Sequence, residues 1–495
     1  MPEPDILIVL SDQHSAACAG FAGNDVVRTP NLDRLAEEGT VFDAAYTSCP
    51  LCVPARSAFL TGQLPSSTGV YRNQQMIPSN VTTFLHSLGA AGYETVLCGR
   101  MHFKGVDQRH GFTRRIFGDV THTYKSGVGD FGPFSGALGM GGCMDLVGAG
   151  DSPILEYDRQ VVRAAVNYLE QDHERPQCIV VGTYGPHFTY CCSPDLFDEY
   201  WPQVEVPPTF FPENDPDHPV KESKAQRQRT NMVTGEEEDV NEHLARAARA
   251  AYYGMITELD GHVGTMRKAW ERYLDRSGRE GVFMYTSDHG DTVGEHGVFG
   301  KQTFYEGSAR IPMIVAGDGV AAGQSVQAPV SIVDIAPTLR DLTGVQQLPH
   351  TDGLSLCSVL RGESPAQDRT VLSEYMEGWG KNIHAGRMVR QNQWKLIHYE
   401  QCQEKDLLFD VANDPQERRD LSTEKPNILQ QLRDRAQSGW EVDRLVDDFR
   451  RDMEQVQYIQ AWAQATDAED IEHWTPPAEV CNMPELVVGQ DSTGS

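Results

Sequence analysis

The sequence predicts an α/β protein, with a large, mostly parallel β-sheet sandwiched by helices and a smaller C-terminal α+β domain containing antiparallel strands. Three observations support this fold class. Apolar runs such as residues 6–10 and 282–287 are typical of strands buried on both faces. Segments with helical spacing of apolar residues separate these runs. After about residue 365 this alternation gives way to short strands and turns, which predicts domains at 1–365 and 366–495.

The elements of the first domain are expected where apolar runs indicate strands and where a three-to-four-residue apolar spacing indicates helices. In chain order they are a strand at 6–10, a capped helix from Thr29 to Gly39, a strand at 41–46, a helix starting at Pro54, a helix at 81–91, a strand at 94–98, a helix at 157–172, a strand at 178–183, a helix at 244–274, strands at 282–287 and 313–316, and a helix at 332–343. The Gly-rich stretch 113–150 is expected to be a long loop that serves as a lid or substrate wall, and the polar stretch 207–238 an exposed excursion. In the second domain, antiparallel strands at 387–390, 394–398 and 407–410 are expected before a helix at 426–460.

The composition is that of a globular protein with a strongly acidic balance. Of 495 residues, 39% are hydrophobic, and 71 acidic against 42 basic residues give a net charge of −29. This excess disfavours binding to nucleic acid and to anionic membranes, so an anionic substrate would have to be attracted by local cations. The first apolar run is too short for a signal peptide or anchor, and eleven irregularly placed cysteines do not suggest a disulfide framework. We therefore expect a cytoplasmic location.

Chemically useful side chains follow several of the expected strands. Asp12 and Gln13 follow the first strand, Arg100 and His102 the strand at 94–98, His187 the strand at 178–183, and Asp288 and His289 the strand at 282–287. Ligand-binding groups collect at the carboxyl ends of parallel strands. Asp12 and Gln13 offer oxygen donors for a hard cation, although Asp12 could equally cap a turn. Either histidine could also be structural.

The stretch from Cys49 to Gly62 is the most distinctive in the chain. Pro54 is suited to a helix start, which would put Cys52 at the helix N-terminus, where N–H groups and the dipole favour an anion. Arg56 lies one helical turn further on and can lean back toward the same point. The pattern suits an oxyanion site, and it also fits a buried cysteine on a helix-starting turn.

Cys52-x-Pro54-x-Arg56 followed by Leu60-Thr61-Gly62 resembles the signature of type I, formylglycine-dependent sulfatases of the alkaline-phosphatase-like superfamily. The resemblance extends over residues 5–420, with the motifs in family order. It implies that Cys52 is oxidised to formylglycine by a formylglycine-generating enzyme and that the hydrate of this aldehyde is the nucleophile. Gln13 and His289 differ from the residues usual in this family, and at these positions the sequence resembles choline sulfatases and phosphonate monoester hydrolases. Arg100 stands where the family usually has a lysine.

The resemblance also implies roles for the other candidates. A divalent cation, Ca²⁺ or alternatively Mn²⁺ because one ligand is a histidine, would be held by Asp12, Gln13, Asp288 and His289. The groups that neutralise the transferred sulfuryl group would be Arg56, Arg100, His187 and Lys301. His102 or His187 would protonate the leaving alcohol, and Asn73 would contact the substrate.

These residues predict hydrolysis of a sulfate ester of a carbohydrate, of choline or of another alkyl or aryl alcohol. The same site suits a phosphonate monoester or phosphodiester hydrolase, and a chain with unmodified Cys52 would be a non-catalytic anion-binding protein. A choline cage could be formed by Glu374, Tyr375, Glu377 and Trp379, which could equally pack the domain junction. By analogy with choline sulfatases, a homo-oligomer is expected.

Overall fold

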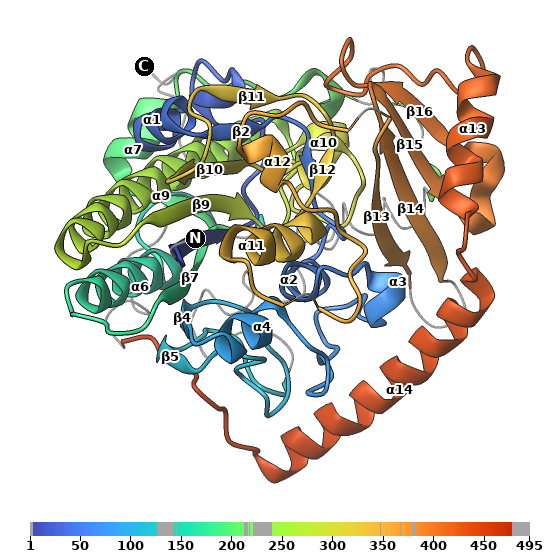
Figure 1. Cartoon of the computed structure of the whole chain (residues 1–495). Coiled ribbons are helices and arrows are strands. Elements are labelled where there is room, and N and C mark those ends of the chain that lie inside the picture. Colours follow the sequence, from blue (N-terminus) through green and yellow to red (C-terminus); the bar gives the residue numbers. More distant parts are fainter. Residues whose placement is uncertain are drawn as a thin grey trace.

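The computed structural model has an eight-stranded and a four-stranded β-sheet with helices around them, and two small two-stranded sheets (Figure 1). It describes residues 3–125, 143–144, 146–211, 216, 218–220, 240–346, 348–366, 368–378 and 383–477. Within these residues, no helix combines the length and the apolar character needed to cross a bilayer.

The larger sheet is mixed and mostly parallel, as expected from the sequence. Its order is β11 (Gln324–Val326), β2 (Thr40–Phe42), β10 (Met313–Gly317), β9 (Gly281–Ser287), β1 (Asp5–Asp12), β7 (Gln177–Pro186), β4 (Glu94–Gly99) and β5 (Arg114–Phe117). The five strands from β9 to β5 are parallel, whereas β10 runs antiparallel to both of its neighbours. β1 therefore lies between two parallel partners, which explains why its apolar run is continuous.

Helices cover both faces of this sheet because alternate strand residues point to opposite sides. Ile6, Ile8 and Leu10 of β1 join the core beneath α2 (Cys52–Thr61), α4 (Phe84–Ala90) and α11 (Ile335–Thr343). Leu7 and Val9 join the opposite core beneath α1 (Pro30–Glu38), α6 (Pro153–Leu169) and α9 (Glu242–Ser277). The two cores fix the direction of β1 and hence the position of its carboxyl end.

The smaller sheet is antiparallel, which confirms the fold class expected for the C-terminal part. It consists of β13 (Thr370–Glu377), β14 (His384–Gln391), β15 (Trp394–Tyr399) and β16 (Leu407–Asp410) in sequence order. One face packs on α13 (Pro426–Gln437), and the other packs on residues around Leu51 and Tyr305. This sheet therefore supports the loop that carries Cys52.

The remaining strands and α-helices include several short elements and one long helix, α14 (Val442–Thr466). The short elements are β3 (Ala45–Tyr46), β6 (Val147–Ala149), β8 (Tyr190–Cys192), β12 (Val330–Ser331), α3 (Pro65–Thr68), α7 (Pro194–Tyr200), α10 (Glu306–Ala309) and α12 (Cys357–Leu360). α14 runs along the outside of the molecule, and the chain after it returns to the edge near β5 (Figure 1).

Several expected boundaries need correction. The helix expected at 426–460 is two helices, because Ser438 is extended and Gly439 has a φ of 65°. β5 lies within the stretch 113–150 that was expected to be irregular, while 126–142 and 145 lie outside the described residues. The strand at 41–46 is split into β2 and β3, and β13 was not anticipated.

Helix starts differ where a side chain decides them. Thr29 was expected to cap α1, but its side chain does not, and the Asp260 carboxylate accepts from the N–H groups of Asn31 and Leu32 instead. α4 begins at Phe84, because Thr83 and His86 form a capping box.

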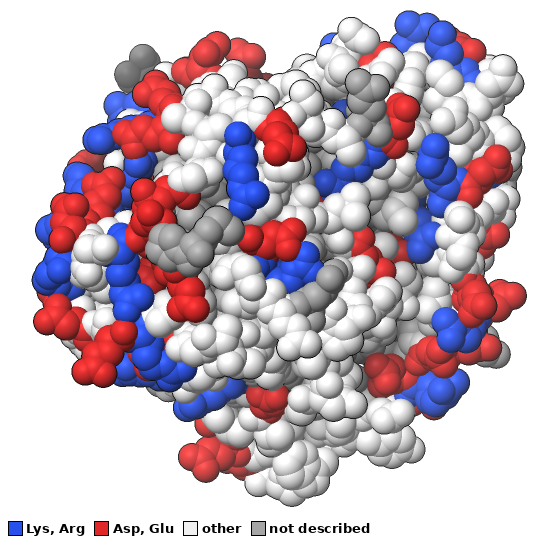
Figure 2. Space-filling model, in the orientation of Figure 1, with Lys and Arg blue, Asp and Glu red and all other residues white. Residues whose placement is uncertain are grey.

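Charges of both signs are interspersed on the face shown in Figure 2, over α6 and α9 at its left. The strongly basic groups of the candidate site, by contrast, are buried: Arg56 and Arg100 have at most 1% of their surface exposed. The basic groups of the site are thus local and buried, and the charged surface of the molecule does not include them.

Candidate active site

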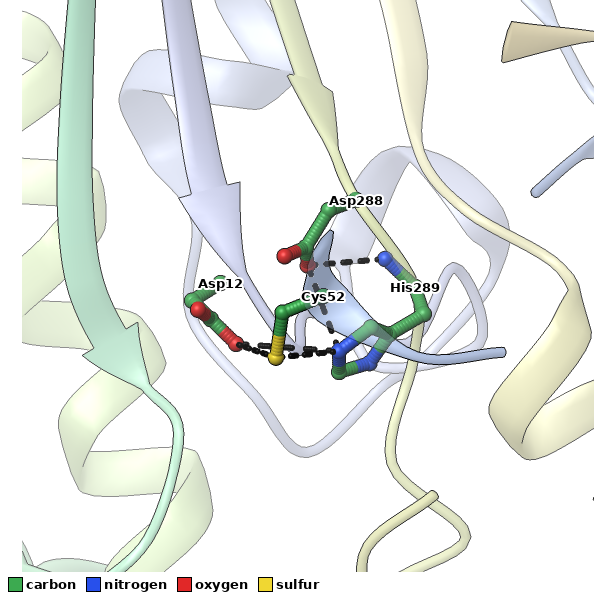
Figure 3. A group of neighbouring side chains, drawn as sticks. All are labelled: Asp12, Cys52, Asp288 and His289. Atoms are coloured by element: carbon green, nitrogen blue, oxygen red, sulfur yellow. Dashed lines mark hydrogen bonds and ion pairs between the residues drawn. The ribbon is translucent and has the colours of Figure 1, made fainter. Parts of the chain in front are cut away.

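The carboxyl ends of β1 and β9 bring three predicted ligands together with Cys52. Asp12 ends β1, and Asp288 and His289 directly follow β9. A ligating atom of each of these residues and of Cys52 lies within 4.8 Å of the others (Figure 3). The Cys52 Sγ is 3.2 Å from His289 Nε2 and 3.7 Å from Asp12 Oδ1. All four side chains are completely buried.

Cys52 is the first residue of α2, so the helix begins two residues before Pro54. The helix N-terminus therefore faces the ligand group, as expected for an anion site. Asn73 accepts a hydrogen bond at Oδ1 from the Val53 N–H, with a distance of 3.0 Å. Asn73 thus holds the start of α2, and a contact with substrate stays a prediction.

Arg56 and Arg100 hold the two carboxylates in place. Arg56 donates from Nε to Asp288 at 2.8 Å, from Nη2 to Asp12 at 3.1 Å and from Nη1 to the Arg100 carbonyl at 3.0 Å. Arg100 donates from Nε to Asp12 at 2.6 Å, and its guanidinium lies 4.3 Å from the centre of the Tyr184 ring. Burial alone would raise the pKa of Asp12, but the positive charges of Arg100, Lys301 and Arg56 lower it well below its usual range. Asp12 is therefore an anion ready to bind a cation.

The donor set fits a divalent cation. His289 Nδ1 donates to the Gly290 carbonyl at 3.0 Å, so Nε2, which faces Cys52, is the nitrogen that would give up its proton to bind a cation. Gln13 donates from Nε2 to Asp291 at 2.6 Å, and its buried Oε1 has no hydrogen-bond partner among the described residues. A buried carbonyl oxygen without a partner is costly unless a cation takes it. Asp12, Asp288, His289 and Gln13 can thus supply three oxygens and one nitrogen.

His102 and His187 are held in opposite tautomers. Arg100 Nη2 lies 2.8 Å from His102 Nδ1; because a guanidinium can only donate, His102 carries its proton on Nε2. His187 Nδ1 lies 2.8 Å from the Phe188 carbonyl, so its neutral Nε2 is a proton acceptor. Burial, followed by Arg100 for His102 and by Lys301 for His187, holds both pKa values well below the usual histidine value. Both rings are neutral in this arrangement.

Lys301 lies at the sulfur atom. Its Nζ is 3.1 Å from Cys52 Sγ and 5.5 Å from the centre of the Phe188 ring. Burial and Asp12 raise the pKa of the Cys52 thiol, but Lys301 and His289 outweigh them and the pKa lies below its usual value. The position of Sγ is thus one where negative charge is stabilised.

Three carboxylates that sequence reasoning missed position this site. Asp119 accepts from the N–H groups of Met101 and His102, and Asp158 from those of Tyr184 and Gly185. Asp291 accepts from Gln13, from the Tyr190 hydroxyl and from the N–H groups of Val293 and Gly300. Asp291 could have been suspected because it lies two residues after His289, in the same Asp288-His289-Gly290-Asp291 segment. Asp119 and Asp158 lie in segments with no motif, and only the fold brings them near.

Glu374 and Tyr375, two of the residues considered for a choline cage, instead pack against neighbouring side chains. The Glu374 Oε1 accepts from Arg387 Nε at 3.0 Å, and its Oε2 accepts from the Ser66 N–H at 2.7 Å. Arg72 donates to the Tyr375 hydroxyl at 2.6 Å. Trp379 lies outside the described residues, as does the side chain of Glu377.

The fold places two carboxylates, an imidazole and a thiol at one sheet edge, an arrangement that can bind a divalent cation beside a nucleophile. Comparisons with known proteins identify the family of the chain. The family model described as "Sulfatase" matches residues 4–345, and the model described as "N-sulphoglucosamine sulphohydrolase, C-terminal" matches residues 294–439. The chain therefore belongs to the sulfatase family.

Individual relatives agree with this assignment. The chain is 34% identical over 470 residues to a choline-sulfatase of Rhizobium meliloti (strain 1021), covering 89% of this chain and 88% of the relative. It shares the alkaline-phosphatase-like fold with the phosphonate monoester hydrolase SpPMH from Silicibacter pomeroyi, with a TM-score of 0.72 at 19% identity, covering 88% of this chain and 95% of the other. A protein solved with its substrate D-glucosamine-2-N,6-O-disulfate has a TM-score of 0.71 at 20% identity, covering 91% and 98%. The protein is thus a sulfuric ester hydrolase.

Proposed function

We propose that this protein hydrolyses a sulfate ester to an alcohol and sulfate, with a formylglycine made from Cys52 as its nucleophile and a divalent cation held by Asp12, Gln13, Asp288 and His289. The observation that carries the proposal is the position of Cys52 Sγ, which lies 3.1 Å from Lys301 and 3.2 Å from His289 at a helix N-terminus. Ca²⁺ suits the oxygen donors, and Mn²⁺ suits the histidine.

The modified side chain and the cation would each supply one kind of chemistry. As its hydrate, formylglycine offers one hydroxyl to attack sulfur and a second whose deprotonation expels sulfate, which a serine or cysteine could not do. A bound divalent cation lowers the pKa of a hydroxyl that it binds and polarises a substrate oxygen.

The chain's own residues would divide the remaining work. Lys301 stabilises negative charge on the oxygens around sulfur, because its ammonium is buried and already oriented. His102 donates a hydrogen bond from Nε2 to the sulfuryl group. His187 would accept at Nε2 the proton that the attacking hydroxyl releases and would pass it to the leaving alcohol oxygen. Arg56 and Arg100 act through Asp12 and Asp288, whose oxygens they orient.

The proposed substrates are esters of choline, of a carbohydrate or of another alkyl or aryl alcohol. The name of the choline-sulfatase relative and the disulfated glucosamine bound to a protein of the same fold support the first two. A phosphonate monoester is the second candidate, because a phosphonate monoester hydrolase shares this fold. Maturation by a formylglycine-generating enzyme, a cytoplasmic location and a homo-oligomer belong to the same proposal.

The test begins with mass analysis of the peptide containing Cys52, from protein made in its own host. An unmodified thiol there would refute the formylglycine nucleophile and favour the anion-binding alternative. On converted protein, kcat/KM is then compared for an aryl sulfate and for the phosphonate monoester with the same leaving group. A higher value for the sulfate supports the proposal, and a higher value for the phosphonate moves the protein to the second candidate.

A further inference from the structure

A second group of metal-binding side chains lies outside the active site, where the chain that follows α14 meets the loop after β5. His122 comes from this loop, and Asp470 and His473 come from the returning C-terminal arm, defined here as residues 467–477. One ligating atom of each residue lies within 4.8 Å of the other two. His122 Nδ1 is 2.7 Å from Asp470 Oδ2, and the two imidazole rings are stacked with their centres 5.2 Å apart.

His473 is oriented as a metal-ligating histidine. Its Nε2 is buried and has no hydrogen-bond partner among the described residues, while the ring makes a hydrogen bond to the backbone of Val120. Because Nε2 has no partner, this bond uses Nδ1. A backbone carbonyl that holds one imidazole nitrogen leaves a lone pair on the other, which is the second-shell arrangement found around metal sites. A buried lone pair that accepts no hydrogen bond is available to a cation.

The surroundings already hold the two segments in register. The Trp474 N–H donates to the Asp119 carbonyl at 2.7 Å, and the Asp119 N–H donates to the Glu472 carbonyl at 3.0 Å. Asp470 Oδ1 accepts from the Thr123 N–H at 2.8 Å, so only its second oxygen faces His122. The donors therefore come from a framework fixed on both sides.

We infer that His122, Asp470 and His473 form a zinc site that fastens the C-terminal arm to the catalytic domain. Two imidazoles and one carboxylate suit Zn²⁺, whereas Ca²⁺ and Mg²⁺ prefer oxygen ligands. Ligand atoms of a tetrahedral zinc site with bonds of about 2.0–2.2 Å lie about 3.4 Å apart, and the three donor atoms here lie within 4.8 Å of one another. Zinc binding therefore requires shifts of about 1 Å together with a rotation of the two stacked rings that turns both lone pairs toward one point. Zinc takes the place of the proton shared by His122 and Asp470, and water fills the fourth position.

The zinc site has a structural consequence for the loop that carries His102. Asp119, which pairs with the arm through its backbone, also accepts from the N–H groups of Met101 and His102 through its side chain. Zinc that holds the arm in place therefore also stabilises the segment that presents His102.

The test measures zinc per chain by mass spectrometry after equilibrium dialysis of the full-length protein against buffered ZnCl₂. A Cys52→Ala/His289→Ala background removes the active-site donors that favour zinc, so one zinc per chain is expected there. Adding His473→Gln should abolish this zinc and weaken binding by at least about 100-fold, since even a lost orienting residue costs about 10–100-fold. His473→Cys should restore it, because a thiolate is a zinc ligand.

His350→Gln is the matched control, because His350 pairs with Asp352 at 3.1 Å on the surface without a second histidine. It should leave zinc binding unchanged. Protease cleavage of the arm in the unaltered chain provides an independent measurement, and zinc should slow it. The inference would be overturned if the Cys52→Ala/His289→Ala protein bound no zinc, or if the same protein with His473→Gln still bound one zinc per chain.

Discussion

Replacing Lys301 with methionine removes the ammonium group from the centre of the site while keeping a side chain of similar length. Lys301 Nζ lies 3.1 Å from Cys52 Sγ, and only 8% of Lys301 is exposed. We expect this variant to lose catalysis rather than stability, because the ammonium's nearest contact is the nucleophile position.

The magnitude follows from this distance. Two unit charges 3.1 Å apart interact by about 5 kcal/mol at an effective dielectric constant of about 20. The negative charge that develops near Lys301 during sulfuryl transfer is shared with other groups, so only part of this energy is lost. Removal of one buried donor to a developing oxyanion costs about 2.7–4 kcal/mol in other enzymes. We therefore expect kcat/KM to fall by about 10²–10³-fold.

The assay is steady-state hydrolysis of an aryl sulfate, normalised to the fraction of residue 52 converted to formylglycine. Lys104→Met is the matched control, because Lys104 is also buried but donates to the His122 and Lys125 carbonyls. It should leave normalised kcat/KM nearly unchanged in folded protein. A loss below about threefold for Lys301→Met, or an equal loss for Lys104→Met, would refute this reasoning.

Three further variants test other parts of the site and fold. Asp291→Asn should weaken the affinity for the divalent cation by about 10–100-fold in calorimetric titration, because it loosens the side chain of Gln13, which follows β1; unchanged affinity would contradict this. His187→Gln should lower kcat/KM by about 10²–10⁴-fold, because an amide cannot transfer the proton. His102→Gln should lower kcat/KM much less, because the amide can still donate and accept a hydrogen bond; a larger loss for His102→Gln would make His102 the proton-transfer group. Asp260→Ala should lower the free energy of unfolding by about 1–3 kcal/mol in urea titration, because it leaves N–H groups at the start of α1 unpaired. Asp275→Ala, at an exposed position of the same helix as Asp260, α9, should leave the free energy of unfolding unchanged.

Much of the candidate site follows from the sequence for a local reason. Asp12, His187 and Asp288 each come directly after an apolar run that forms a buried parallel strand. The carboxyl ends of such strands share one sheet edge, so a linear pattern predicts that these side chains converge. Cys52 belongs to the same prediction, since its motif also specifies a helix start.

Boundaries were less predictable where a distant residue decides them. The start of α1 depends on Asp260, which lies more than two hundred positions away in α9. No local spacing carries this information. The break between α13 and α14, by contrast, has a local signal at Ser438-Gly439, which the helical spacing on either side obscured.

The sequence by itself determined the fold class, the nucleophile motif and the residue types at the strand ends, because each depends on short-range pattern. Only the tertiary structure decided what these residues are bonded to. Arg100 sets the tautomer of His102, the Phe188 carbonyl sets that of His187, and Asp291 leaves one oxygen of Gln13 without a partner. Hydrogen bonds of this kind join segments far apart in the chain, so their geometry exists only after the two cores have packed.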